Sequence, residues 1–373
     1  MKEIINCNIA VIGGGVVGLA TALELQQAGH ETILIEKNSL IGDEVSSRNS
    51  GVIHSGIYYP PHSLKAQLTF KGNQFLYEYA HKNDVPVQQV GKIIYGHDKD
   101  QDRLNALIKN GEANGVQGLS LLDHKEIKEL EPNLNENITT GIFSKFTGII
   151  DVPLLMASYA KNFESLGGVI SKNSKCLESS QKFNKHHSLI QTGEEQFWLD
   201  SDKIIFATGL HSFNNGQNIS SIKHSESLKK INYSKGHYYK ISGNAPFQHL
   251  IYPLPDSHGL GIHYTLDLSG AAKFGPDVEF IDNIDLSFSQ GSMERFRNSI
   301  KNYWPEVIHH ALQEDYVGVR PKIQMKDEPF ADFSFLTYDH HGSEGLIFMQ
   351  GIESPGLTCS LAIAKYIREK LDL

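Results

Sequence analysis

Residues 8–36 read NIAVIGGGVVGLATALELQQAGHETILIE, and this stretch decides the fold. An apolar strand runs straight into a glycine-rich turn, a helix follows, and a second apolar strand ends in an acid. Gly13 permits the tight turn from strand to helix, Gly15 lets the backbone approach a pyrophosphate, and Gly18 lets helix and strand pack closely. The stretch therefore predicts a Rossmann-like dinucleotide site.

The same stretch indicates how a dinucleotide would be held. Its pyrophosphate would face the unpaired N–H groups and the positive dipole end of the helix that begins after Gly15. Glu36 lies about twenty residues further on, where a carboxylate accepts hydrogen bonds from a ribose 2′-hydroxyl and repels a 2′-phosphate. The pattern by itself does not separate FAD from NAD.

Composition points to an enzyme of two domains. The chain has 373 residues, of which 40% are hydrophobic and 21% charged, and its net charge of −9 gives no general attraction to nucleic acid. We expect neither a signal peptide nor a membrane span, because the first strand begins near residue 8 and no apolar run reaches about 18 residues. The three cysteines, Cys7, Cys176 and Cys359, suit a reducing compartment. We therefore expect a cytoplasmic protein, and contact with the inner face of a membrane stays open.

Hydrophobic periodicity predicts the main elements along the chain. Residues 202–209 and 345–350 read as buried parallel strands like the first one, and residues 225–330 read as short strands, 260–265 among them, with aromatic and polar alternation. The fold class is therefore α/β, or α+β overall, with a mainly antiparallel sheet domain inserted into a Rossmann-like domain. The predicted helices are 63–82, 100–114, 124–130, 153–166, 290–302 and 357–370.

A long loop over residues 46–59 reads SSRNSGVIHSGIYY, and ordered loops of this length are usually functional. Small residues flank His54 there, which suggests close approach of the backbone to a flat ring. Three histidine doublets, at 186–187, 309–310 and 340–341, lack a carboxylate or cysteine at metal-ligand spacing. We expect these doublets at the surface and predict no metal site.

Several of these motifs resemble one family. The pattern from Gly13 to Glu36 is similar to the extended FAD fingerprint of the D-amino-acid-oxidase-like (DAO) flavoproteins. Ile204–Gly209 resembles the second flavin motif of that family, and Gly318–Pro321 resembles its substrate-binding Arg-Pro. Gly351–Gly356 resembles its C-terminal flavin loop. Within the family, the L-2-hydroxyglutarate dehydrogenases are the group that residues 49–66, 261–265 and 274–276 resemble most closely.

The resemblance implies a non-covalently bound FAD and two interleaved domains. Residues 1–85, 145–225 and 330–373 would form the FAD-binding domain, and residues 86–144 and 226–329 the substrate-binding domain. The residues implied to bind FAD are Gly13, Gly15, Val16, Val17, Gly18, Glu36, Lys37, Asn49, Ser50, Gly51, Ala207, Thr208, Gly209, Gly351, Ile352, Glu353, Ser354, Pro355, Gly356, Leu357 and Thr358.

The resemblance also implies where substrate binds. Arg320 would clamp a carboxylate, since a guanidinium binds it through two parallel hydrogen bonds; a structural salt bridge is the alternative. His54 would take the proton of a substrate hydroxyl, and its alternatives are a flavin contact and a hydrogen-bonded loop histidine. Tyr239, Tyr252 and His263 are second-rank substrate contacts, each explained equally well by packing within the sheet.

The implied activity is oxidation of a small L-2-hydroxy acid, foremost L-2-hydroxyglutarate, to the 2-oxo acid with hydride transfer to flavin N5. The partners would be the carboxylate substrate and a quinone or other electron acceptor, with no nucleic acid. An oxidase or dehydrogenase of amino acids or secondary amines is the alternative on the same fold. A flavin protein without turnover is a third possibility.

Overall fold

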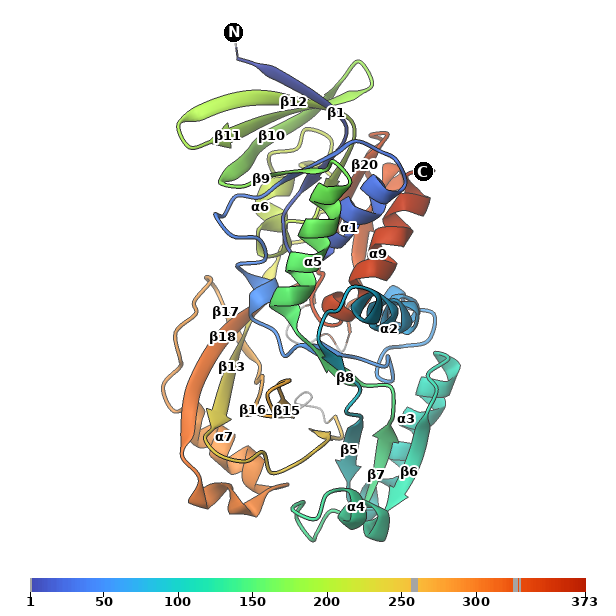
Figure 1. Cartoon of the computed structure of the whole chain (residues 1–373), viewed down its shortest axis with the longest axis vertical. Coiled ribbons are helices and arrows are strands. Elements are labelled where there is room, and N and C mark those ends of the chain that lie inside the picture. Colours follow the sequence, from blue (N-terminus) through green and yellow to red (C-terminus); the bar gives the residue numbers. More distant parts are fainter. Residues whose placement is uncertain (1, 256–260, 325–327, 329) are drawn as a thin grey trace. The chain divides into compact units, whose positions relative to one another are not determined.

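A computed structural model describes residues 2–255, 261–324, 328 and 330–373. The chain folds into two compact units, and each is assembled from separate segments (Figure 1). The first unit consists of Met1–Ser47, Val152–Tyr233 and Arg320–Leu373. The second consists of Arg48–Asp151 and Ser234–Val319.

The first unit is built on an eight-stranded sheet in the order β10-β11-β12-β1-β2-β9, with β20 beside β12 and β19 beside β20. Strand β1 pairs in parallel with both β2 and β12, and Ile12 lies opposite Ile35 on one side and Phe206 on the other. The carboxyl ends of three strands therefore meet at one edge. The strands are β1 (Ile4–Ile12), β2 (Thr32–Ile35), β9 (Val169–Ser171), β10 (Ser174–Lys182), β11 (Lys185–Thr192), β12 (Glu195–Phe206), β19 (Ser334–Leu336) and β20 (Leu346–Gln350).

Helix α1 (Val16–Gln27) packs against two other helices, α5 (Val152–Ser165) and α9 (Gly356–Lys370), as Figure 1 shows. Because these neighbours cover it, α1 is buried on nearly all sides over its first nine residues. Its apolar residues therefore form no single stripe, as an amphipathic surface helix would require. The unit also contains the short helices α6 (Ser212–Gly216) and α8 (Tyr338–His341).

The second unit is built on a nine-stranded sheet in the order β17-β13-β16-β15-β14-β5-β7-β6, with β18 beside β13. Most of its pairs are antiparallel, but β14 and β5 run parallel, so that Leu250 lies opposite Lys92 and Tyr252 opposite Ile94. The strands are β5 (Lys92–Gly96), β6 (Leu119–Asp123), β7 (Thr140–Ser144), β13 (Asn232–Ile241), β14 (Leu250–Pro253), β15 (Tyr264–Leu266), β16 (Ala272–Phe274), β17 (Glu279–Ile281) and β18 (Leu312–Lys322).

A small sheet and four helices complete the second unit. Strand β8 (Gly148–Ile150) pairs with β3 (Val52–Ile53) and β4 (Val87–Gln88). The helices are α2 (Leu64–Lys82), α3 (Gln101–Ala113), α4 (His124–Leu130) and α7 (Ser292–Lys301).

The predicted fold class is confirmed, and each predicted helix lies within two residues of an observed one. Several sequence-based boundaries differ. The second segment of the first unit covers Val152–Tyr233 rather than residues 145–225, and its third segment begins at Arg320 rather than at residue 330. Residues 48–85 belong to the second unit, because β3 pairs with β8 and α2 follows in the same segment. The strand predicted over 260–265 begins at Tyr264, and Leu260 lies outside the described residues.

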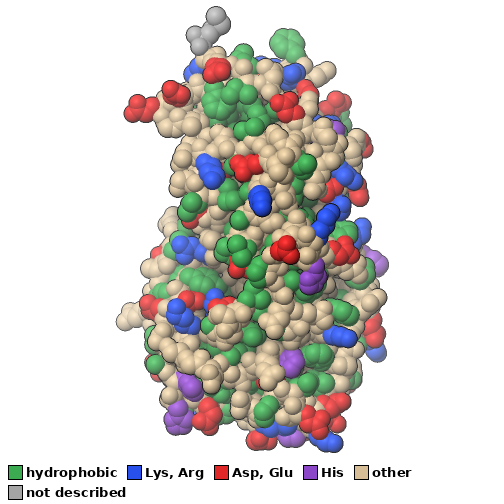
Figure 2. All heavy atoms as spheres, viewed as in Figure 1, with side chains coloured by type: hydrophobic (Ala, Val, Ile, Leu, Met, Phe, Trp, Pro, Cys, Tyr) green, Lys and Arg blue, Asp and Glu red, His purple; other side chains and the backbone are tan. Residues whose placement is uncertain are grey.

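The surface position predicted for the histidine doublets is wrong for His186. It is 1% exposed, and its ring nitrogen bonds to the carbonyl of Glu344, because β11 lies inside the sheet rather than at its rim. Acidic and basic side chains are interspersed over the face that Figure 2 shows. Across the described ranges, no helix is both long and apolar enough to cross a membrane.

Candidate active site

The carboxyl-terminal edge of the first unit's sheet forms a glycine-lined turn. Gly13 has φ +111°, and a Cβ there would lie 2.4 Å from the carbonyl oxygen of Ala207. A Cβ on Gly18 would lie 1.9 Å from the carbonyl oxygen of Gly13. These approaches are possible only for glycine. Glycine at both positions therefore allows β1, α1 and the end of β12 to pack closely, as the fingerprint requires.

Gly15 differs from its neighbours because its surroundings are open. A Cβ there would meet one atom, the Ser46 Oγ, at 3.1 Å, and that hydroxyl accepts the N–H of Val16 at 3.0 Å. Gly15, the N-cap of α1, has no side chain of its own to cap the helix, and no acidic residue lies in the first turn. The positive end of the helix dipole therefore faces a cradle suited to a phosphate.

Glu36 is fixed at the end of β2 by two backbone groups. Its carboxylate is 6% exposed and accepts the N–H of Gly14 at 2.6 Å and the N–H of Asn38 at 2.7 Å. A carboxylate held beside the glycine turn is placed to accept hydrogen bonds from a ribose.

Lys37 lies outside this turn. Its Nζ lies 2.6 Å from Glu44 Oε1 and 2.8 Å from His211 Nε2. Burial of Glu44 would raise its pKa, but hydrogen bonds from His211 and Lys37 outweigh that effect and lower it to about 2. The three side chains hold one another at the surface of the first unit.

The predicted flavin loop joins β20 to α9. Gly351 has φ +67°, Gly356 begins α9, and the first turn of that helix carries no acidic side chain. Glu353 in this loop pairs with Lys322 at 2.9 Å, and their side chains are only 8% and 15% exposed. Cys359 is fully buried in α9, which fits a packing role for this residue.

Arg320 precedes Lys322, the ion-pair partner of Glu353 in this loop, by two residues. It lies near the end of β18, partly exposed, between the buried Val319 and Pro321. Because side chains alternate along a strand, Arg320 shares a face with Lys322, the partner of Glu353. Arg320, the predicted carboxylate clamp, therefore lies on the same face of β18 as Lys322, whose ammonium binds Glu353 in the predicted flavin loop.

The long loop is held firmly within the second unit. Asn49 accepts the Tyr316 hydroxyl at its carbonyl (2.7 Å), and Ser50 bonds the Tyr238 hydroxyl at 3.1 Å. Gly51 donates its N–H to the Asn49 side chain at 2.8 Å. The carbonyl of His54 accepts the Asn73 amide at 3.0 Å. These bonds fix the backbone before the histidine and at the histidine itself.

His54 is neutral near pH 7. Its ring is partly exposed, and removal of water by the surrounding protein, with the nearby charge of Lys92 as a second cause, lowers its pKa to about 3. A neutral imidazole carries a lone pair on one ring nitrogen, which is the form that accepts a proton from a hydroxyl.

Tyr252 and His263 are brought together on one face of the large sheet. Their rings stack with centroids 3.5 Å apart. The ammonium of Lys92 lies 4.9 Å from the centre of the Tyr252 ring and 4.6 Å from that of Tyr58. Burial lowers the pKa of Lys92 to about 7 and raises that of Tyr252. We call Lys92, Tyr58, Tyr252 and His263 the lysine–tyrosine cluster.

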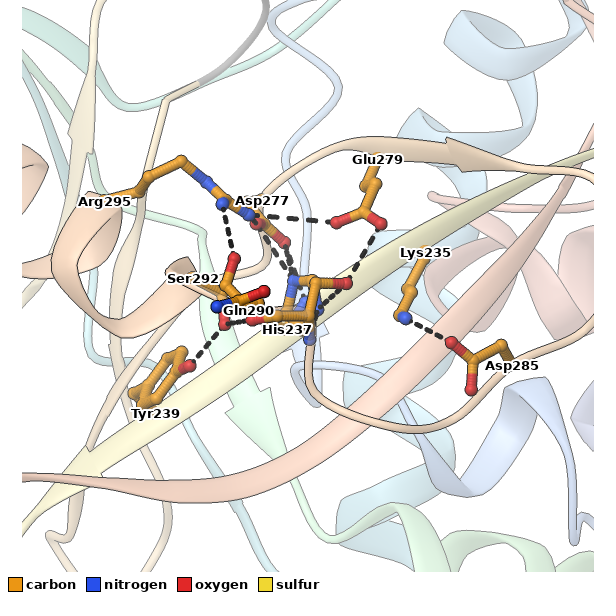
Figure 3. A network of polar contacts seen from close by, with 10 residues as sticks. Lys235, His237, Tyr239, Asp277, Glu279, Asp285, Gln290, Ser292 and Arg295 are labelled. Atoms are coloured by element: carbon orange, nitrogen blue, oxygen red, sulfur yellow. Dashed lines mark hydrogen bonds and ion pairs between the residues drawn. The ribbon is translucent and has the colours of Figure 1, made fainter.

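Tyr239 lies on the opposite face of that sheet. It is fully buried against Phe288 and Phe296, and its hydroxyl bonds Ser292 of α7 at 2.7 Å. Figure 3 shows its ring pointing toward Ser292, beside the network of His237 and Asp277. This placement favours the packing alternative over the predicted substrate contact.

Sequence reasoning missed the neighbouring Tyr238. Its ring stacks on Tyr316 at 4.3 Å, and it bonds the loop at Ser50. The alternation along β13 places Tyr238 and Tyr239 on opposite faces, but both are buried, so hydrophobicity could not indicate which one faces the loop. Lys92 was missed because it lies in an apolar strand, VGKIIY, where a lysine reads as a surface residue.

The residues of the first unit fit FAD. An open Gly15 cradle at a helix N-terminus suits its pyrophosphate, Glu36 suits its adenosine ribose, and the N-terminus of α9 suits a group that becomes negative on reduction. The predicted residues therefore fall into two sets, with His54, Asn49, Ser50 and Gly51 in the second unit.

Residues 8–370 match the family described as "DAO: FAD dependent oxidoreductase". The chain is 33% identical to the mitochondrial L-2-hydroxyglutarate dehydrogenase of Arabidopsis thaliana, over 96% of the chain and 82% of the relative. It is also 33% identical to the L-2-hydroxyglutarate dehydrogenase of Indibacter alkaliphilus, over 97% and 98%.

Solved structures of similar fold include two oxidases. The L-α-glycerophosphate oxidase of Mycoplasma pneumoniae, solved with FAD bound, superimposes with a TM-score of 0.87 at 23% identity, over 99% of this chain and 95% of that one. The glycine oxidase of Geobacillus kaustophilus superimposes with a TM-score of 0.81 at 17% identity, over 98% and 95%.

Proposed function

The chain belongs to the DAO family of FAD-dependent oxidoreductases, and from this membership we propose that it oxidises a small L-2-hydroxy acid to the 2-oxo acid. L-2-Hydroxyglutarate is the substrate we propose first, because relatives named for it are 33% identical over nearly the whole chain. When bound, FAD supplies the acceptor, N5, for the hydride that leaves the substrate Cα. The protein has to bind the acid, orient it and remove the hydroxyl proton.

The observation that carries this proposal is the state of His54. A hydroxy acid becomes a 2-oxo acid only if its hydroxyl proton departs along with the Cα hydride, so the reaction needs a base near the hydroxyl. His54 is uncharged near pH 7, and its loop is fixed by the Asn73 and Ser50 hydrogen bonds. In this role its ring nitrogen takes the hydroxyl proton and becomes cationic.

Arg320 takes the substrate carboxylate in this proposal. A guanidinium is always charged and matches both oxygens of a carboxylate, so it fixes orientation as well as affinity. Support for this role comes from Lys322, which shares its strand face with Arg320 and pairs with Glu353 of the predicted flavin loop. A purely structural Arg320 would leave substrate orientation unaffected when it is replaced.

The electron acceptor and the location are also proposals. We propose that electrons pass from FAD to a quinone or another carrier in the cytoplasm, with peripheral contact at a membrane when the carrier is a quinone. Cys7, Cys176 and Cys359 are all buried and none of them forms a disulfide, which suits a reducing compartment. Cell fractionation, together with activity assays using quinones, dyes and oxygen as acceptors, tests both points.

The substrate class is tested by anaerobic bleaching of the purified yellow holoenzyme. An amino acid can lose its ammonium proton to solvent before oxidation, so amino-acid and amine substrates need no enzymic base. We expect L-2-hydroxyglutarate and related L-2-hydroxy acids to bleach the flavin and amino acids to leave it oxidised. Bleaching by amino acids or secondary amines alone would replace this proposal with the alternative activity.

A further inference from the structure

The second unit contains a buried cation that the proposed mechanism leaves unused. Lys92, at the start of β5, is 1% exposed. Its ammonium has no hydrogen bond or ion pair with any of the described residues. Its contacts are the ring faces of Tyr58 and Tyr252, at 4.6 and 4.9 Å.

Such an arrangement is costly unless something compensates the charge. Removing an ammonium from water is unfavourable, and ring faces return only part of the lost solvation. Burial alone shifts the pKa of Lys92, so no acidic side chain among the described residues acts on it as a counter-ion. The buried hydroxyl of Tyr58 also has no hydrogen-bond partner there.

The groups around Lys92 come from several elements, and none of them is an acid. Tyr58 follows β3, Tyr252 lies on β14, and His263 stacks on Tyr252 just before β15. His54, in the loop of Tyr58, is close enough for the Lys92 charge to lower its pKa. The cluster therefore offers a cation and a hydroxyl donor beside the predicted base, and none of the described residues supplies an acidic group to pair with them.

We propose that Lys92 and Tyr58 form a subsite for the side-chain acid group of the substrate, so that the lysine–tyrosine cluster selects dicarboxylic over monocarboxylic 2-hydroxy acids. This inference rests on the proposed function. A carboxylate in the subsite satisfies the ammonium and the Tyr58 hydroxyl together, and a methyl group in its place leaves both unpaired.

The test compares two substrates of equal length in the holoenzyme. L-2-Hydroxyvalerate carries a methyl group where L-2-hydroxyglutarate carries its second carboxylate. We expect Lys92→Met to lower kcat/KM for L-2-hydroxyglutarate by about 100-fold, or about 2.7 kcal/mol, and to change that for L-2-hydroxyvalerate by less than about 3-fold. Equal effects on the two substrates, or none on either, would overturn the inference.

Two further variants sharpen this comparison. Tyr58→Phe removes only the hydroxyl and should lower kcat/KM for the dicarboxylate by about 10-fold, since one hydrogen bond to a charged group is lost. Lys240→Met removes a half-exposed lysine of β13, in the same sheet, that pairs with Asp315 of β18, and should leave kcat/KM for both substrates unchanged. A Tyr58→Phe enzyme with wild-type selectivity would exclude the hydroxyl from the subsite.

A binding measurement separates failure of this inference from failure of the proposed function. Glutarate and valerate lack the 2-hydroxyl, so calorimetry with the oxidised holoenzyme reports binding without turnover. We expect Lys92→Met to weaken the binding of glutarate by at least about 30-fold and to leave the binding of valerate unchanged. Glutarate binding that is absent in the wild type or insensitive to Lys92 overturns the inference, even when hydroxy acids are oxidised. Loss of all hydroxy-acid turnover with Lys92-dependent glutarate binding overturns only the proposed function.

Discussion

Two glycines three residues apart, Gly15 and Gly18, make opposite predictions, although both belong to one fingerprint. Gly18 lies inside α1, and a Cβ there would come within 1.9 Å of the Gly13 carbonyl oxygen. Contacts below 3.0 Å essentially never occur for a real Cβ, so the helix must move by at least the difference, 3.0 − 1.9 = 1.1 Å. A Cβ on Gly15 meets only the Ser46 Oγ, at 3.1 Å, which needs a shift of a few tenths of an ångström.

The free energies follow from these distances. Replacing glycine by alanine inside a helix gains about 1 kcal/mol of helix propensity, but forcing atoms into a packed interior costs about 1–3 kcal/mol or more. The obstacle at Gly18 is a backbone carbonyl that no rotamer change can remove, so the cost lies at the upper end, about 3 kcal/mol. After the gain in helix propensity, we expect Gly18→Ala to destabilise the apoprotein by about 2 kcal/mol. Gly15→Ala loses only the preference for glycine at an N-cap, about 1 kcal/mol or less.

For FAD affinity, in contrast to stability, we expect Gly15→Ala to be the more damaging of the two substitutions. The Cβ of Gly15→Ala projects into the phosphate cradle, and a steric cost of about 1–3 kcal/mol corresponds to about 5- to 150-fold weaker FAD binding. Urea unfolding of the apoprotein measures the first quantity, and FAD titration of apoprotein by flavin fluorescence measures the second. Unchanged FAD affinity in Gly15→Ala, or equal destabilisation by both substitutions, would refute the assignment of this cradle to the pyrophosphate.

Three further predictions concern the substrate side. His54→Ala should slow anaerobic flavin reduction by L-2-hydroxyglutarate by roughly 10²–10⁴-fold, the usual contribution of a general base, while glutarate affinity stays within a few fold. Arg320→Ala should lower kcat/KM by about 10- to 150-fold for mono- and dicarboxylic substrates alike, because a charge-assisted hydrogen bond contributes about 1.5–3 kcal/mol. The kcat/KM for L-2-hydroxyglutarate should fall as pH rises above about 7, because burial lowers the pKa of Lys92 to about 7 and only its charged form attracts the second carboxylate. Lys92→Met should abolish that decline.

Each of these has a contrary outcome. Flavin reduction in His54→Ala at the wild-type rate would leave the histidine as a flavin contact or a loop residue. An Arg320→Ala enzyme with unchanged kinetics would make Arg320 a structural residue. A decline above pH 7 that persists in Lys92→Met would assign the titration to another group.

The first unit was largely predictable from sequence because its signals are local. Each signal is contained in a few consecutive residues. The signals are the turn from β1 to α1, the acid at the end of β2 and the glycine after β20. Their physical requirements, a positive φ or a close backbone approach, can be met by few residue types. The structure reproduces this local geometry at Gly13 and Gly18.

The lysine–tyrosine cluster was not predictable, because it depends on register between distant segments. Lys92 comes near Tyr252 only because β5 and β14 pair in parallel with Lys92 opposite Leu250. No local pattern specifies that pairing. The faces of β13 on which Tyr238 and Tyr239 lie could not be predicted either. Because both tyrosines are buried, their hydrophobicity does not indicate which of the two side chains points to which face of the sheet.

The pairing of Lys322 with Glu353 illustrates the same limit. Each residue lies beside a motif that sequence reasoning identified, the Arg-Pro pair and the C-terminal loop. Their ion pair across 31 positions, at 2.9 Å, is visible only once β18 and the loop are placed. Sequence thus identified both motifs without the bond that joins them.

A single-turnover measurement tests the central claim most directly, namely that FAD held by the first unit is reduced by an L-2-hydroxy acid. Oxidised holoenzyme is mixed anaerobically with one equivalent of L-2-hydroxyglutarate, and flavin absorbance and 2-oxoglutarate are quantified together. Our account predicts one 2-oxoglutarate formed for each flavin bleached. A protein that purifies without flavin and takes none up, or a flavin that stays oxidised with every 2-hydroxy acid while an amino acid bleaches it, would contradict the account.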